Sequence, residues 1–71
     1  MKTEEYIKNF NGQILGIIET LDNGDQVARS FPLRQVLGFY RAKYNHTTDF
    51  LGRVLTRGNS VANLIFNDPN K

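Results

Sequence analysis

One short phrase occurs three times in this chain of 71 residues. It reads NGQILGII at residues 11–18, LRQVLGFY at 33–40 and LGRVLTRG at 51–58, and each copy follows one or two residues after a phenylalanine. The repeated unit is long enough for one β-hairpin, and a lone hairpin cannot bury its apolar side. The recurrence therefore predicts three related hairpins that pack against one another.

Turn signals separate the extended segments. Asn-Gly at residues 11–12 and Asp-Asn-Gly-Asp at 22–25 predict tight hairpin turns, because Asn and Gly accept positive φ. Pro32 has no N–H to donate, so it is expected to end a strand or to lie at an edge. We therefore predict an all-β meander of short antiparallel strands in a single domain spanning residues 1–71. The predicted hairpin units span about residues 10–31, 31–50 and 50–66. The predicted strands span residues 5–10, 13–20, 26–31, 35–42, 46–50, 53–57 and 60–66.

The last of these segments fits two periodicities. Val61, Leu64 and Ile65 are spaced as on one face of a helix, and Ser60 is a residue type that caps helix starts. Alternate residues of the same segment would also share one face of a strand. A strand over 60–66 is the favoured prediction, and a short C-terminal helix is the alternative.

Apolar residues occur on both faces of the predicted strands. Ile14 and Leu15 are neighbours and point to opposite faces, and the other two copies repeat this pair. Strands of this kind are covered on both sides, one side by other hairpins and the second, we expect, by another subunit. Gly16 and Gly38 occupy equivalent places, where glycine marks a bulge, a close backbone approach or a simple kink.

On folding, a domain of this size buries only about 60% of the surface that its unfolded chain exposes. Small domains therefore often depend on a disulfide, a metal or oligomerisation for stability. The chain has no cysteine and one histidine, His46, which excludes disulfides, thiolate zinc sites and histidine-rich metal sites. We therefore expect no metal and no cofactor, and a homo-oligomer.

Charge is divided unequally along the chain. Residues 1–25 carry two lysines and five acidic residues, whereas residues 26–71 carry seven basic and two acidic residues. This division suits an anionic partner or the acidic arm of a neighbouring copy, and it also suits an ordinary solvated surface. Three interpretations of residues 1–7 stay open: a strand, a tail or such an arm, with residues 1–5 as the candidate flexible part.

No segment is apolar enough for a signal peptide or a membrane span, so the chain is expected to be soluble and cytoplasmic.

Basic and aromatic residues alternate in the second half of the chain. Such a mixture is found in small β domains that bind single-stranded nucleic acid, but core and interface aromatics with arginines on the rim are the favoured interpretation. On a strand Phe39 and Arg41 would share one face and Tyr40 would take the other. The candidate interaction surface comprises Arg34, Phe39, Tyr40, Arg41, Lys43, Tyr44, Arg53 and Arg57.

The sequence offers no constellation for catalysis. His46 and Asp49 are the closest pair of metal-ligand types, and a site needs three or four. Neither Ser30 nor Ser60 lies in a nucleophile motif. We expect a protein without enzymatic activity that acts by self-association or by binding another protein, with single-stranded nucleic-acid binding as the alternative.

The phrases FNGQILG, FPLRQVLG and FLGRVLT resemble the tandem β-hairpin repeats of uncharacterised bacterial four-fold β-flower proteins, and MORN and WG repeats are similar in arrangement. The second phrase lacks the first glycine and has one more residue, and the third ends in threonine. The resemblance covers about residues 10–66. It implies petal-like hairpins that self-associate, and it assigns no catalytic residue.

Overall fold

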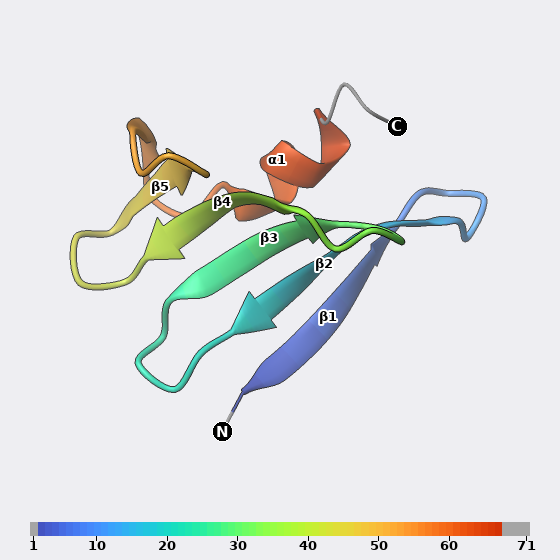
Figure 1. Ribbon diagram of the computed structural model, residues 1–71, viewed down its shortest axis with the longest axis horizontal. Coiled ribbons are helices and arrows are strands. Elements are labelled where there is room, and N and C mark those ends of the chain that lie inside the picture. The colour runs from blue at the N-terminus through green and yellow to red at the C-terminus, as the bar shows by residue number, and fades with distance from the viewer. Residues whose placement is uncertain (1, 68–71) are drawn as a thin grey trace.

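The computed structural model describes residues 2–67; Met1 and residues 68–71, with the counted charges Asp68 and Lys71, lie outside this part. In it, six antiparallel strands form one sheet in sequence order, followed by one helix that lies over a face of the sheet (Figure 1). The strands are β1 (Thr3–Lys8), β2 (Ile14–Thr20), β3 (Gln26–Ser30), β4 (Val36–Arg41), β5 (His46–Asp49) and β6 (Val54–Arg57), and the helix is α1 (Val61–Phe66). The all-β meander is confirmed, and each strand end lies within two residues of its predicted position.

The β1–β2 and β5–β6 hairpins close with the same three-residue loop. The Gly12 N–H donates to the Asn9 carbonyl at 3.0 Å, and the Asn9 N–H donates to the Gln13 carbonyl at 3.0 Å. Asp49 and Gly52 repeat this pattern, and both loop glycines have positive φ (83° and 90°). The asparagine before Gly12 does not have positive φ, so the loop is a turn followed by a left-handed glycine and differs from the predicted two-residue Asn-Gly turn.

The β3–β4 loop is one residue longer than these two. Its Ser30 N–H donates to the Gln35 carbonyl at 2.9 Å, and the Arg34 N–H donates back to the Ser30 carbonyl at 3.1 Å. Arg34 has a φ of 61° and stands where the other two loops have glycine. Pro32 is the second residue of this loop after β3, as predicted for a residue that ends a strand.

Each copy of the phrase also carries a β-bulge at its leucine. The register skips Leu15 between β1 and β2, Leu37 between β3 and β4, and Leu55 between β5 and β6. An extra residue on one strand bends that strand and increases its twist. The three hairpins therefore share both their loop position and their bend.

The prediction of a strand over residues 60–66 is wrong, because Val61–Phe66 is helical. Val61 and Ile65 are four residues apart, so they lie on one side of the helix, and both are buried against the sheet. A strand would also place these two residues on one face, because residues an even number apart share a strand face. Ser60 is the N-cap residue, but its side chain makes no capping bond. The Asn59 side-chain oxygen instead accepts the Val61 N–H at 3.3 Å.

The helix packs on the two equivalent glycines. A Cβ atom at Gly16 would lie 2.6 Å from the Arg29 carbonyl oxygen and 2.8 Å from Ile65 Cγ2. At Gly38 it would meet the Thr48 carbonyl oxygen and lie 2.5 Å from Leu64 Cδ1. Close approach of the backbone and the helix therefore requires glycine at both positions, beside the bulged leucines. The core between helix and sheet is centred on Ile18, Ala28, Val61 and Ile65.

On the other face of the sheet, the chain itself covers β1–β3. Ile17 is fully buried there, and Tyr6 lies directly across from it in the ladder. The Phe31 ring meets the Tyr6 ring edge-on at 6.3 Å, and Arg34 from the same loop pairs with Glu4 at 3.4 Å. The contacts on this side of β1–β3 thus come from the chain's own loop between β3 and β4.

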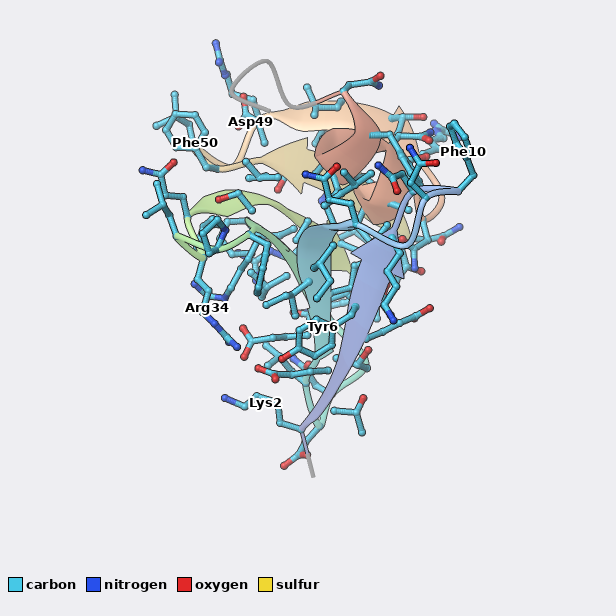
Figure 2. All side chains as sticks on the ribbon, turned by 90° about the vertical axis from the view of Figure 1, so that its right-hand side faces the viewer. Lys2, Tyr6, Phe10, Arg34, Asp49 and Phe50 are labelled. Carbon is cyan, nitrogen blue, oxygen red and sulfur yellow. The ribbon has the colours of Figure 1, made fainter. Side chains whose placement is uncertain are left out.

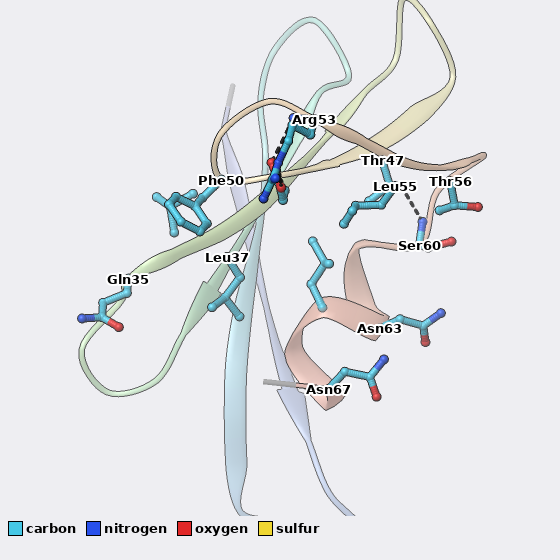
Figure 3. A pocket seen from close by; sticks show the side chains of 13 residues that line it. Gln35, Leu37, Thr47, Phe50, Arg53, Leu55, Thr56, Ser60, Asn63 and Asn67 are labelled. Carbon is cyan, nitrogen blue, oxygen red and sulfur yellow. Dashed lines mark hydrogen bonds and ion pairs between the residues drawn. The ribbon is translucent and has the colours of Figure 1, made fainter. Parts of the chain in front are cut away.

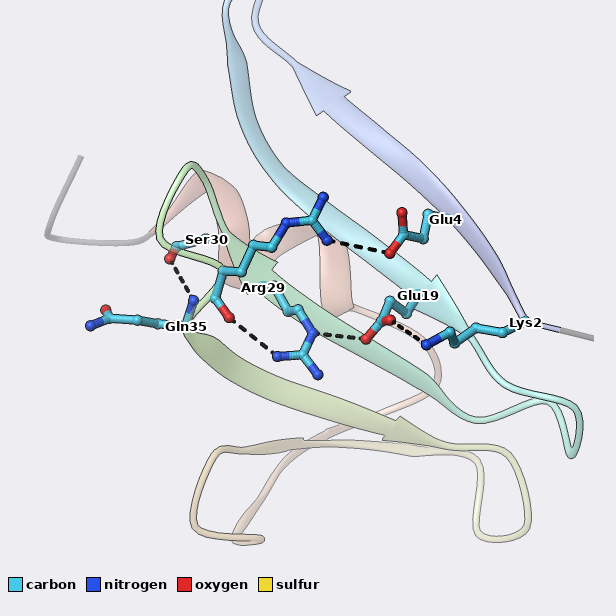
Figure 4. Close-up of polar contacts among 7 residues, drawn as sticks. Lys2, Glu4, Glu19, Arg29, Ser30 and Gln35 are labelled. Carbon is cyan, nitrogen blue, oxygen red and sulfur yellow. Dashed lines mark hydrogen bonds and ion pairs between the residues drawn. The ribbon is translucent and has the colours of Figure 1, made fainter.

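Polar contacts continue this cover (Figure 4). Arg29 Nε donates to Glu19 at 2.7 Å, Lys2 Nζ lies 3.3 Å from the other Glu19 oxygen, and Arg29 also donates to the Arg34 carbonyl at 3.2 Å. Hydrogen bonding from Arg29 holds the pKa of Glu19 below its ordinary value; burial opposes the shift and Lys2 adds to it. The N-terminal segment thus belongs to the sheet, where Thr3 pairs with Thr20.

Candidate interaction surface

The eight predicted residues do not form one surface. Five of them lie on or beside the face of β4–β6 that points away from α1, and His46 lies among them. We call this set the basic-aromatic face: Phe39, Arg41, Lys43, Tyr44, His46 and Arg57.

Rings and cations alternate on the basic-aromatic face. The Arg41 guanidinium lies 4.9 Å from the centre of the Phe39 ring, and the Tyr44 and His46 rings stack with centres 5.3 Å apart. Lys43 Nζ lies 5.5 Å from the centre of the Tyr44 ring. His46 is directly opposite Arg41 on one side and Arg57 on the other. Within residues 2–67, Arg57 has no ion-pair partner.

The other three predicted residues lie elsewhere. Tyr40 points toward α1, as strand alternation predicted, and its hydroxyl donates to the Asn45 side chain at 2.8 Å. Arg34 is on the loop over β1, paired with Glu4. Arg53 pairs with Asp49 at 2.8 Å at the far end of the β5–β6 hairpin.

A groove of about 870 Å³ runs between α1 and the last three strands (Figure 3). Leu37 of β4, Leu55 of β6 and Leu64 of α1 face it, with Phe50 at its rim. The helix covers Gly16 and Gly38 but not the third equivalent position, Thr56, which lines the groove and is exposed. The groove therefore exists because α1 packs mainly on β2–β4 and leaves β6 exposed.

Polar contacts join the two walls of the groove at one end and stabilise the β5–β6 hairpin at the other. The Thr47 hydroxyl accepts the Ser60 N–H at 2.8 Å and donates to the Gly58 carbonyl at 2.8 Å, which ties the start of α1 to β5. At the other end, the backbone N–H of Arg53 donates to Asp49 and is the main reason that the pKa of Asp49 lies below its ordinary value. The Thr47 hydroxyl and the Asp49 carboxylate therefore both make hydrogen bonds within the chain.

Apolar side chains are exposed along the outer wall. All four residues of β6 are exposed, including Val54 (58%) and Leu55 (53%), and Phe50 and Leu51 of the preceding loop are exposed as well. Figure 2 shows Phe50 and Phe10 at the outside of their hairpins. Clustered exposed apolar surface of this kind marks interaction sites in soluble proteins.

Sequence reasoning missed the groove because it favoured a strand for residues 60–66. The helical spacing of Val61, Leu64 and Ile65 was the signal that could have found it. His46 was considered only in the search for metal and catalytic sites, and its stacking against Tyr44 depends on the turn between β4 and β5.

No arrangement for metal chemistry is found in the described part of the chain. No three His, Asp or Glu side chains of residues 2–67 gather closely enough to hold an ion. His46 and Asp49 point to opposite faces of the sheet, because they are three residues apart on one strand. The only helix of residues 2–67 is too short to cross a membrane.

Comparison of the chain with family models, with curated protein sequences and with solved structures gives no match.

Proposed function

We propose that this chain is a non-enzymatic β module that acts by binding protein surfaces, in the first place a second copy of itself. The observation that carries the proposal is β6, an edge strand whose four residues are all exposed. An open edge offers unpaired main-chain N–H and C=O groups. The exposed side chains on and just before this strand include the apolar residues Val54, Leu55 and Phe50. The groove behind β6 adds the concave apolar surface that a partner can fill.

The small size of the domain supports the same proposal. Within residues 2–67, six apolar residues are buried: Ile17, Ile18, Val27, Ala28, Val61 and Ile65. A core this small stabilises a monomer weakly, and burial of additional apolar surface in an assembly adds to its stability.

Light scattering coupled to size exclusion tests the proposal. Over micromolar concentrations the wild-type chain is expected to show a mass above that of one copy, and Leu55→Asp is expected to reduce it to one copy. Phe10→Asp is the matched control, because Phe10 is 97% exposed on the opposite hairpin. A wild-type chain that stays monomeric throughout would contradict the proposal, as would equal effects of the two substitutions.

The basic-aromatic face supports a second candidate function, binding of single-stranded nucleic acid. The exposed Tyr44 ring is a surface on which a base can stack, with Lys43 and Arg57 beside it for phosphates. Fluorescence anisotropy with a labelled single-stranded oligonucleotide at two salt concentrations tests it. Phosphate binding must weaken steeply with salt, and Tyr44→Ala should weaken it by about 1–3 kcal/mol. Absence of binding at low salt ends this candidate.

A further inference from the structure

The two open edges of the sheet carry opposite charges. The β1 edge contains Glu4 and Glu5 with one lysine, Lys8, and the β6 edge contains Arg57 without any acidic residue. Neighbouring strands already pair antiparallel throughout the sheet. A β1 strand placed beside β6 would continue the same order.

The alternation of hydrogen bonds decides which residues each edge presents. On β6, the Gly58 N–H points inward to Asn45. Because inward and outward residues alternate in an antiparallel ladder, Arg57 presents its N–H and C=O outward, and beyond the bulge Val54 does the same.

On β1, the Asn9 N–H points inward to Gln13, so that the same alternation directs the main-chain groups of Lys8, Tyr6 and Glu4 outward.

The bulge at Leu55 makes the two edges match in spacing. Arg57 and Val54 are three residues apart, yet they face β5 residues that are only two apart, His46 and Thr48. Glu4 and Tyr6 are also two residues apart. A β1 strand can therefore meet both outward positions of β6 at once.

We infer that β6 of one copy pairs with β1 of the next, with Arg57 opposite Glu4 and Val54 opposite Tyr6. All four side chains lie on the face away from α1, so each pair shares a face. This inference rests on the proposed function and names its interface.

The charges favour this register over its neighbours. A shift by two residues would place Val54 opposite Lys8, and a further shift would place Arg57 opposite Lys8. Glu4 accepts Arg34 of its own chain through Oε2, which leaves Oε1 for Arg57 of the neighbour. Val54 and Tyr6 form the apolar and aromatic cross-strand pair that stabilises sheets.

The charges also favour this pairing over symmetric ones. Pairing of β6 with β6 would supply no carboxylate to Arg57. Pairing of β1 with β1 would leave the apolar residues Val54 and Leu55 exposed. A β6–β1 contact is head-to-tail, so assembly continues until a ring closes or a filament forms.

Cysteine cross-linking tests the register, because the chain has no cysteine of its own. The variants are Val54→Cys and Tyr6→Cys, mixed in equal amounts and mildly oxidised. Opposite residues of a hydrogen-bonded pair have Cα atoms about 5.5 Å apart, within the range that a disulfide spans. A disulfide-linked dimer is expected in the mixture and not in either variant alone.

Three results would overturn the inference. One is a linked dimer of Tyr6→Cys alone, which reports β1–β1 pairing. Another is stronger linkage of Val54→Cys to Lys8→Cys than to Tyr6→Cys, which reports a different register. The third is no linkage while both variants keep the wild-type mass and circular dichroism; in that case the proposed function stands and only this interface fails. A chain that is monomeric at every concentration contradicts both the proposed function and this interface.

Charge reversal supplies an independent measurement. Arg57→Glu alone and Glu4→Lys alone are each expected to weaken association about tenfold, since a like-charged cross-strand pair replaces an opposite one. An equimolar mixture is expected to regain wild-type association, because each reversed edge then meets a complementary one. An Arg57→Glu defect that Glu4→Lys does not rescue overturns the pairing.

Discussion

Ile65 of α1 packs directly on the backbone of Gly16 in β2, so that a Cβ atom at Gly16 would lie 2.8 Å from Ile65 Cγ2. Leu64 stands in the same relationship to Gly38 in β4. The helix therefore touches the sheet at two equivalent points of two hairpins, with no side chain between. These two contacts determine where α1 lies and, through that, where the groove opens.

Replacement of either glycine is expected to destabilise the fold. Gly16→Ala places a methyl group against the Arg29 carbonyl and Ile65, and overpacking of this kind lowers the free energy of unfolding by about 1–3 kcal/mol. Urea denaturation measures the change. Thr56→Ala is the control, because Thr56 is the equivalent residue of the third phrase and is exposed; its effect should stay within about 0.5 kcal/mol. Equal effects of the two substitutions would contradict the packing described.

The Thr47 hydroxyl is expected to matter more than its methyl group. Thr47→Val leaves the Ser60 N–H and the Gly58 carbonyl without their partner, and loss of a buried partner costs about 1–3 kcal/mol. Thr56→Val is the control, since Thr56 lies directly opposite on β6 and is exposed. Thermal unfolding compares the two variants. A stable Thr47→Val variant would show that α1 does not depend on this anchor.

Glu19 is expected to make stability depend on pH. Its pKa in the folded chain lies below the ordinary value of 4.5, chiefly because Arg29 donates to it. The contribution to the free energy of unfolding is therefore fully present above pH 4.5 and is lost as the pH falls through the lower, folded-state pKa. Glu19→Gln should cost about 1–3 kcal/mol at pH 7, where the charged hydrogen bond is lost.

The measurement is urea denaturation of both proteins between pH 7 and pH 3. The difference between wild type and Glu19→Gln should shrink as the pH falls, because the wild-type carboxylate is protonated. A difference that stays constant would contradict the role given to Arg29 and Lys2. Asp25 and Asp49 have lowered pKa values too, but they are present in both proteins and cancel.

The phenylalanines of the hairpin loops are expected to differ sharply in how much they contribute to the free energy of unfolding. Phe31→Ala removes the edge-on contact with Tyr6 and part of the cover over Ile17, which should cost about 1–2 kcal/mol. Phe10→Ala should change stability by no more than about 0.5 kcal/mol, since that ring is almost fully exposed. Chemical denaturation of the two variants checks this. A larger effect at Phe10 would mean that its loop is covered in solution.

Much of the sheet could be predicted because its signals are local. Loop residues such as Gly12 and Gly52 occupy left-handed positions that few other residues tolerate, and they mark where the chain turns. The predicted strand ends therefore lie within two residues of the observed ones. A bulge was one of the interpretations of Gly16 and Gly38, but its position at the preceding leucines was not predicted, because an extra residue in a strand is visible only against its partner strand.

The candidate surface was predicted less well for the same reason. Phe39 and Arg41 share a face because alternation along one strand is local. The positions of Arg34 and Arg53 depend on partners, Glu4 and Asp49, that loops and pairing bring near them. Residue type therefore identified which side chains were basic or aromatic, but not which of them lie together.

By itself, the sequence determined that this chain turns repeatedly and forms short antiparallel hairpins, because φ preferences and two-residue alternation act between near neighbours. Only the tertiary structure decided that residues 61–66 are helical, since six residues fit either period and the outcome depends on what they pack against. Gly16 and Gly38, far away in the sequence, provide a surface flat enough for a helix. The groove and the exposed β6 edge follow from that non-local contact.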